Sequence, residues 1–174
     1  MLPSHGKIEC RKCFTDSTKI NKPHPEWSIV NDPGAWGNNT PKYLVLGFSK
    51  GSTQANAYDQ GAFNDVAFAR MRPRLTAILQ KLGLLKKEAS VDSVIADPEG
   101  DFTFGSLIRC SVSRFDKKLS TENKKVYACT GPLISKSFNE IPDVIDRCVS
   151  EFLLDLPDRT GIVFFLGNTD SYVK

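Results

Sequence analysis

The residues whose type and spacing best suit them to chemistry are the cysteines. Cys10 and Cys13 are separated by two residues, a spacing that lets both thiolates reach one metal from a single tight turn. Arg11 and Lys12, which lie between them, favour the thiolate form. A redox dithiol uses the same spacing but is expected where a helix starts after a strand, and no strand pattern precedes Cys10. The pair predicts a metal site, with two unconnected thiols in a flexible N-terminus as the alternative.

Three more cysteines follow: Cys110, Cys129 and Cys148. The odd total and the polar N-terminus, which has no signal-peptide core, argue against a disulfide framework. Four thiolates favour an iron–sulfur cluster or zinc. Because Cys148 falls on the apolar face of a predicted helix, a buried core thiol is its alternative role.

A second chemical feature is a basic stretch at residues 109–125. It carries six basic and two acidic side chains, although the whole chain has a formal net charge of only +3. A basic loop can neutralise phosphates, and the alternative is an ordinary solvated loop. The candidate phosphate-binding residues are Arg114, Lys117, Lys118, Lys124 and Lys125.

Length and composition set the class of protein. The 174 residues predict one domain over residues 1–174, and 40% hydrophobic with 25% charged residues excludes disorder, coiled coil and collagen. The longest purely apolar run, Ile162–Leu166, is far below the roughly 20 residues of a membrane helix. We therefore expect a cytoplasmic globular protein without membrane contact.

The elements that must position these residues follow from hydrophobic patterning. Continuous apolar runs predict buried strands at 43–48, 102–110 and 161–167, typical of a parallel sheet. Apolar residues at helical spacing predict helices over 68–82 and 144–153, where Pro73 starts or kinks the first and Pro142 suits the first turn of the second. Ser137 with Glu140 offers a rival, earlier capping box.

The remaining segments are expected to be less regular. Residues 1–41 are predicted to be an irregular arm, and 86–100 a surface excursion. The strand–helix alternation predicts an α/β fold with a parallel sheet. Ligands in such sheets bind beyond the carboxyl ends of the strands, which are Gly47–Gly51, Arg109–Ser113 and Gly167–Thr169.

Taken in order, these motifs resemble the iron–sulfur type of the uracil-DNA glycosylase superfamily. The carriers are Cys10 with Cys13, the glycine-bracketed Gly47-Phe48-Ser49-Lys50-Gly51, Gly61-Ala62-Phe63, Leu79-Gln80-Lys81-Leu82-Gly83-Leu84, Arg109-Cys110, Cys148 and Leu166-Gly167. The resemblance spans nearly the whole chain. It implies a three-layer sandwich with a short central parallel sheet flanked by helices.

The resemblance also implies a cofactor and a partner. Cys10, Cys13, Cys110 and Cys148 would hold a 4Fe-4S cluster, with Cys129 as the alternate ligand and zinc as the alternate metal. The partner would be single- or double-stranded DNA, from which a damaged base is flipped and excised by hydrolysis of its N-glycosidic bond.

Candidate base- and DNA-binding residues are Gly47, Phe48, Ser49, Lys50, Gly51, Phe63, Ser106 and Arg109. Phe63 would stack on the flipped base or, alternatively, pack the start of a helix. Lys50 would pair with a phosphate or, alternatively, face solvent. Ser49 could position a water molecule, but it is too weak a base to remove its proton alone.

The chain departs from the family pattern at several points. Phe48, Ser49 and Lys50 replace the usual acid, small residue and proline, and Ser106 replaces an asparagine that would read the base edge. The spacing from Cys110 to Cys148 is more than double that of the family. The family's further helix, fourth strand and His-Pro-Ser motif do not occur before Lys174.

These departures keep two functions open. One is a uracil-glycosylase-like DNA-repair hydrolase, and the other is a non-catalytic, metal-bearing nucleic-acid-binding module on the same fold. A fragment or a reduced relative would also leave the third strand without a neighbour, so we expect self-association through its edge.

Overall fold

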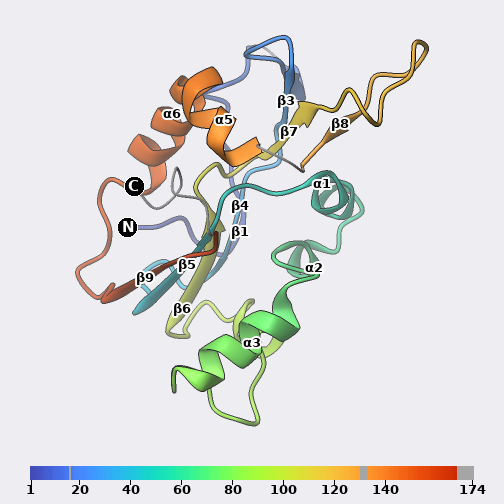
Figure 1. Cartoon of the computed structure of the whole chain (residues 1–174). Coiled ribbons are helices and arrows are strands. Elements are labelled where there is room, and N and C mark those ends of the chain that lie inside the picture. Colours follow the sequence, from blue (N-terminus) through green and yellow to red (C-terminus); the bar gives the residue numbers. More distant parts are fainter. Residues whose placement is uncertain (16, 130–132, 168–174) are drawn as a thin grey trace.

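The computed structural model describes residues 1–15, 17–129 and 133–167 (Figure 1). Its main sheet has five strands in the order β1-β4-β6-β5-β9. They are β1 (Gly6–Lys7), β4 (Gly34–Gly37), β6 (Phe102–Ser106), β5 (Tyr43–Gly47) and β9 (Ile162–Phe165). Strand β5 pairs in parallel with both β6 and β9, so the three apolar runs form the predicted parallel sheet. The fold is α/β, as the sequence predicts.

Residues 1–41 are not irregular, and this prediction is wrong. They contain β1 and β4, which extend the main sheet in antiparallel fashion, and two strands of a second sheet. The second sheet is antiparallel in the order β2-β3-β7-β8, with β2 (Ile20–Asn21), β3 (Trp27–Val30), β7 (Ser111–Phe115) and β8 (Tyr127–Ala128). These strands are only two to five residues long, and most of their partners lie far away in the sequence, so no continuous apolar run marks them.

Four helices cover one face of the main sheet (Figure 1). They are α1 (Ser52–Asp59), α2 (Phe63–Val66), α3 (Arg72–Lys81) and α4 (Val91–Val94). Pro73 lies in the first turn of α3, as predicted, but Phe68 precedes the helix. Residues 86–100 are more than a surface excursion, because Val91 and Ile95 are buried in this core.

Helices α5 (Leu133–Glu140) and α6 (Pro142–Phe152) pack against the second sheet. Pro142 occupies the first turn of α6, and Val144, Ile145 and Cys148 form its buried face, as predicted. Ser137 does not cap a helix start. It is buried within α5, where its hydroxyl donates to the carbonyl of Ile134 at 2.6 Å.

The opposite face of the main sheet carries a smaller apolar cluster. Leu44 and Leu46 of β5 pack there with Leu2, and with the partly buried Leu153 and Val163. Strand β9 has a partner only on its β5 side among the described strands, and Ile162 is 43% exposed. Across the described part of the chain, no helix has the length and apolar character needed to cross a membrane.

Candidate metal centre and neighbouring cavity

Four cysteines from distant parts of the chain lie in one electrostatic neighbourhood. Cys10 and Cys13 follow β1, Cys110 directly precedes β7, and Cys148 lies in α6. The Cys148 thiol interacts electrostatically with the thiols of Cys10 and Cys13, and that of Cys110 interacts with Cys148. These are the four residues that the motif order selects. Within the described ranges, no three His, Cys, Asp or Glu side chains already meet the geometry of a bound ion.

Two of these thiols are deeply buried. Cys110 and Cys148 are each 7% exposed, and Cys13 packs against the same apolar cluster. Burial raises the pKa of Cys110 to about 12 and that of Cys148 to about 11, because the charged thiolate loses its solvation. As free groups these side chains are neutral thiols at pH 7, and a metal would have to displace their protons.

Hydrogen-bond donors oppose this effect of burial. The backbone N–H of Asp32 donates to the Cys110 sulfur, and the backbone N–H of Arg109 donates to the Cys148 sulfur. The Arg147 side chain donates to Cys13, although burial still raises the pKa of that thiol. Donors aimed at a sulfur stabilise its thiolate form.

Basic side chains also surround the thiols. The positive charge of Lys50 opposes the rise in the pKa of Cys110. Arg109 does the same for Cys148, and Arg147 does the same for Cys13. Lys12 interacts with Cys10 and forms an ion pair with Glu151. Four neutral thiols need no such surroundings, whereas a group of four metal-bound thiolates is anionic and gains from them.

The surroundings of the Arg109 guanidinium indicate whether an anionic group fits among these cysteines. Arg109 is 1% exposed, and none of its three guanidinium nitrogens has a hydrogen-bond acceptor within the described ranges. A buried, unpaired cation is strongly unfavourable. A metal–thiolate group held by Cys10, Cys13, Cys110 and Cys148 would supply the missing negative charge, so the residues present fit such a group.

Cys129, the alternate ligand, has a different setting. It is exposed, and its thiol donates to the carbonyl of Val112 at 3.1 Å. Its sulfur lies 3.5 Å from the position that a Cβ on Gly51 would occupy. Cys129 therefore lies beside the last residue of the loop that precedes α1.

A cavity of about 360 Å³ opens at the carboxyl edge of β5 and β6. The predicted loop Gly47–Gly51 contributes all five of its residues to the wall, and Ser106 lies at the end of β6. Leu166, which directly follows β9, also lines the cavity, so all three parallel strands lead to it. The first predicted strand end, Gly47–Gly51, lines this cavity. The second, Arg109–Ser113, does not, because β6 ends at Ser106. Residues 168 and 169 of the third lie outside the described residues.

The aromatic wall of the cavity is Phe68 rather than Phe63. Phe68 has a φ of 54° and its ring lies 3.1 Å from the position that a Cβ on Gly47 would occupy. Trp36 also lines the cavity. The spacing of Phe68 in the sequence places it on the apolar face of the predicted helix, and no local pattern indicates its positive φ.

Phe63 lies outside the cavity wall. Its ring stacks on Trp36 with centroids 4.6 Å apart, and its carbonyl accepts a hydrogen bond from Trp36 Nε1 at 2.9 Å. It packs the start of α2, which was the alternative to base stacking. The Phe48 side chain is likewise part of the apolar core, tilted against Phe138.

Lys50 is neither solvent-facing nor presented to a phosphate. It is 2% exposed, and its ammonium forms an ion pair with Asp32 at 3.5 Å and donates to the carbonyl of Arg109. Asp32 also accepts from the backbone N–H and the hydroxyl of Ser111, at 2.7 and 2.6 Å. Burial lowers the pKa of Lys50, and Asp32 opposes that shift.

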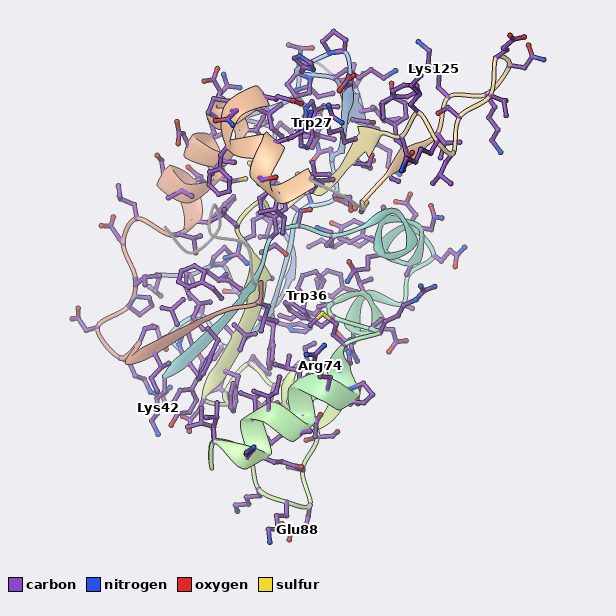
Figure 2. The ribbon with its side chains drawn as sticks, in the orientation of Figure 1. Trp27, Trp36, Lys42, Arg74, Glu88 and Lys125 are labelled. Atoms are coloured by element: carbon purple, nitrogen blue, oxygen red, sulfur yellow. The ribbon has the colours of Figure 1, made fainter. Side chains whose placement is uncertain are left out.

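The basic stretch forms a hairpin between β7 and β8. Its connection, residues 116–126, projects away from the body of the molecule, and Lys125 points outward from it (Figures 1 and 2). Thr121 and Lys124 exchange two backbone hydrogen bonds near its tip. Four of the five predicted phosphate-binding side chains are exposed on this hairpin: Lys117, Lys118, Lys124 and Lys125.

Arg114, the fifth, is at the stem and is differently engaged. It forms ion pairs with Glu26 and Glu140 and lies over the Trp27 ring at 6.0 Å. It therefore ties the hairpin to α5. None of the four lysines has an ion-pair partner among the residues described.

The polar residues of the cavity wall limit its chemistry. They are Ser49, Lys50, Gln54, Arg70 and Ser106. No carboxylate or imidazole lines the cavity within the described ranges, and the one amine, that of Lys50, is engaged by Asp32 and by the carbonyl of Arg109. His5 and His24 instead accept hydrogen bonds from the backbone N–H groups of Gly37 and Glu26.

Comparison with known proteins finds no family model, no curated protein and no solved structure that matches this chain.

Proposed function

We propose that this protein binds nucleic acid, holds one unstacked base in the cavity at the edge of its parallel sheet, and carries a cysteine-ligated metal centre. We further propose that it does so on a three-layer fold of the uracil-DNA glycosylase type. In this function the hairpin supplies sequence-independent attraction to phosphates, and the cavity supplies a pocket for a single base.

The observation that carries the proposal is the contact between the hairpin stem and the cavity wall. Cys129, one residue after β8, lies against Gly51, which lines the cavity. A strand attracted by the four exposed lysines would therefore run toward the cavity mouth. The cavity has the size of a small-ligand site, and the Phe68 ring offers a surface for stacking.

The metal centre would be held by Cys10, Cys13, Cys110 and Cys148. We infer an iron–sulfur cluster, with zinc as the alternative, and its role would be to join the N-terminal arm to the turn before β7 and to α6. It would not act on the base, because three of its four ligands belong to the apolar core or pack against it.

A second candidate is hydrolysis of the N-glycosidic bond of a flipped base. The location of the cavity beyond the ends of β5 and β6, with Ser49 and Ser106 in its wall, favours it. Ser49 could position the attacking water, but a hydroxyl does not accept its proton effectively at neutral pH. Binding without turnover is therefore the first proposal, and excision is the second.

The binding proposal is tested by fluorescence anisotropy with labelled single- and double-stranded DNA over a salt series. The variant replaces Lys117, Lys118, Lys124 and Lys125 with glutamine. Its affinity should fall about equally for all sequences, and its duplex salt slope should fall by about 0.9 for each lysine that contacts a phosphate.

The matched control removes four exposed cations from the corner formed by α3 and the following loop, where Figure 2 labels Arg74 and Glu88. Arg74, Lys81, Lys86 and Lys87 are replaced with glutamine, which changes the net charge equally. This control should bind like the parent. Parent-like binding by the hairpin variant would overturn the proposal, and release of uracil from a uracil-containing strand would establish the second candidate.

A further inference from the structure

The Arg109 guanidinium is the only buried side-chain group without a hydrogen-bond partner among the residues described. It is 1% exposed and its Nε, Nη1 and Nη2 atoms have no acceptor among the residues described. The nearest favourable contact is the Phe152 ring, 5.7 Å from the guanidinium carbon. A cation–π contact with one ring offsets only part of what burying an ion costs.

The surroundings hold this cation in place rather than release it. A Cβ on Gly105 would overlap Arg109 Nη1, so the guanidinium lies directly over the backbone of β6. Its backbone N–H donates to the Cys148 sulfur, and its carbonyl accepts from Lys50. The chain therefore fixes the guanidinium over Gly105 and the Arg109 backbone beside the Cys148 sulfur.

We propose that Arg109 is the built-in counter-cation of the metal–thiolate group, a positioning residue whose buried charge is balanced only when the cysteines hold their metal. This inference rests on the metal centre proposed above. An arginine side chain is not deprotonated in proteins, so Arg109 is charged at pH 7. The interaction with Cys148 favours that charge.

The proposal has an unusual consequence for stability. In the metal-free protein the guanidinium is an uncompensated buried charge, and an apolar replacement of similar length removes that cost. In the loaded protein the same replacement removes the partner of an anionic group. An apolar replacement of Arg109 should therefore stabilise the metal-free protein and weaken metal retention in the loaded protein.

The test compares Arg109→Met and Arg109→Lys with the parent in the full chain. Each is examined metal-free and after anaerobic loading with ferrous iron and sulfide. Arg109→Met should raise the metal-free melting temperature by several degrees and lose iron to a chelator about 10–100-fold faster. Its reduction potential should fall, because a buried cation favours the more negative, reduced state. Arg109→Lys should restore the potential and most of the iron retention.

Arg74→Met is the matched control, because it makes the same change at an exposed arginine on α3 (Figure 2). It should alter neither iron retention nor potential. Parent-like iron retention and potential in Arg109→Met would overturn the inference while leaving the metal centre standing. Failure of the parent itself to take up iron would overturn both, so the two failures are distinguishable.

Discussion

Whether a cysteine is suited to be the fourth metal ligand depends on the surroundings of its side chain, as Cys129 and Cys148 show. Both are cysteines downstream of Cys110, and sequence alone leaves either one as the fourth ligand. Cys148 lies in α6 and is 7% exposed, and its thiol interacts electrostatically with the other three thiols. Cys129 is exposed and lies beside the cavity loop. Only tertiary packing distinguishes these two cysteines as candidate ligands.

This difference gives a prediction for ligand identity. Cys148→Ser should lose most of its iron after anaerobic loading, because serine replaces a thiolate ligand in a site where metal-binding energy is also folding energy. Cys129→Ser is the matched control and should retain the parent's iron content and its absorbance near ~400 nm. The reverse outcome would assign the fourth ligand to Cys129.

Tyr58 gives a prediction for pH dependence. Its hydroxyl donates to the carbonyl of Pro33 at 3.0 Å, and burial, followed by the negative charge of Asp32, raises its pKa to about 12. An unfolded tyrosine titrates near ~10. Because the folded pKa is the higher one, this contribution to stability is complete below pH ~10 and is lost as the pH rises toward 12.

The expected loss is about 2 kcal/mol of unfolding free energy across that window. Urea unfolding of the parent and of Tyr58→Phe at a series of alkaline pH values measures it. Other groups titrate in both proteins and cancel in the difference. If the stability difference between the two proteins stays constant from pH 9 to 11.5, Tyr58 is not the group responsible.

At the scale of elements, the sequence predicts those whose signal is local. The runs that form β5, β6 and β9 are apolar on successive residues, and α6 begins at a proline and repeats its apolar side chains at helical spacing. Strands β3 and β4 lack such a signal. Strand β3 is defined by its pairing with β7, more than 80 residues away in the chain.

The hairpin formed by β7 and β8 is another element that the sequence predicts only in part. Its charge is visible in the sequence, and a basic excursion is expected there. Its shape is not visible, because the stem depends on β3 pairing with β7 and on Arg114 contacting Glu26 and Glu140. Lys50 is a further case: its burial depends on Asp32, whose approach no spacing rule indicates.

Strand β4 gives a prediction at this scale. Gly37 ends β4 with a φ of 94°, and a Cβ there would overlap the carbonyl oxygen of Phe102 in β6. Gly37→Ala should cost about 3 kcal/mol or more, since backbone strain and steric overlap add. It should therefore unfold at markedly lower urea concentration.

Gly61→Ala is the control for backbone strain alone. Gly61 has a φ of 88°, but no atom lies within 4 Å of its added Cβ. Its cost should be about 1–2 kcal/mol, and the gain from a stiffer unfolded chain is common to both variants. Equal costs for the two substitutions would show that the β4–β6 approach is not as close as described.

At the scale of the whole molecule, three of the four thiols belong to one apolar core or pack against it, and Cys10 approaches them from the segment that follows β1. The main-sheet core lies around Val45 and Phe104, while Cys110 and Cys148 lie in the core between the second sheet and α5–α6. A metal bound by all four would close long loops between these cysteines, and closing such loops stabilises the chain mainly by restricting its unfolded state.

We therefore predict that metal binding stabilises the whole chain and not only the N-terminal arm. At a free metal concentration 100 times Kd, the gain is about 2.7 kcal/mol, or a rise in Tm of roughly 5–10 °C for a chain of this size. Binding should also protect Arg11 and Lys12 from trypsin, because the ligands on either side fix that turn. Cys13→Ser is the control and should show neither effect. A loaded parent whose Tm and N-terminal cleavage rate match those of the metal-free protein would show that the thiols hold metal without stabilising the chain.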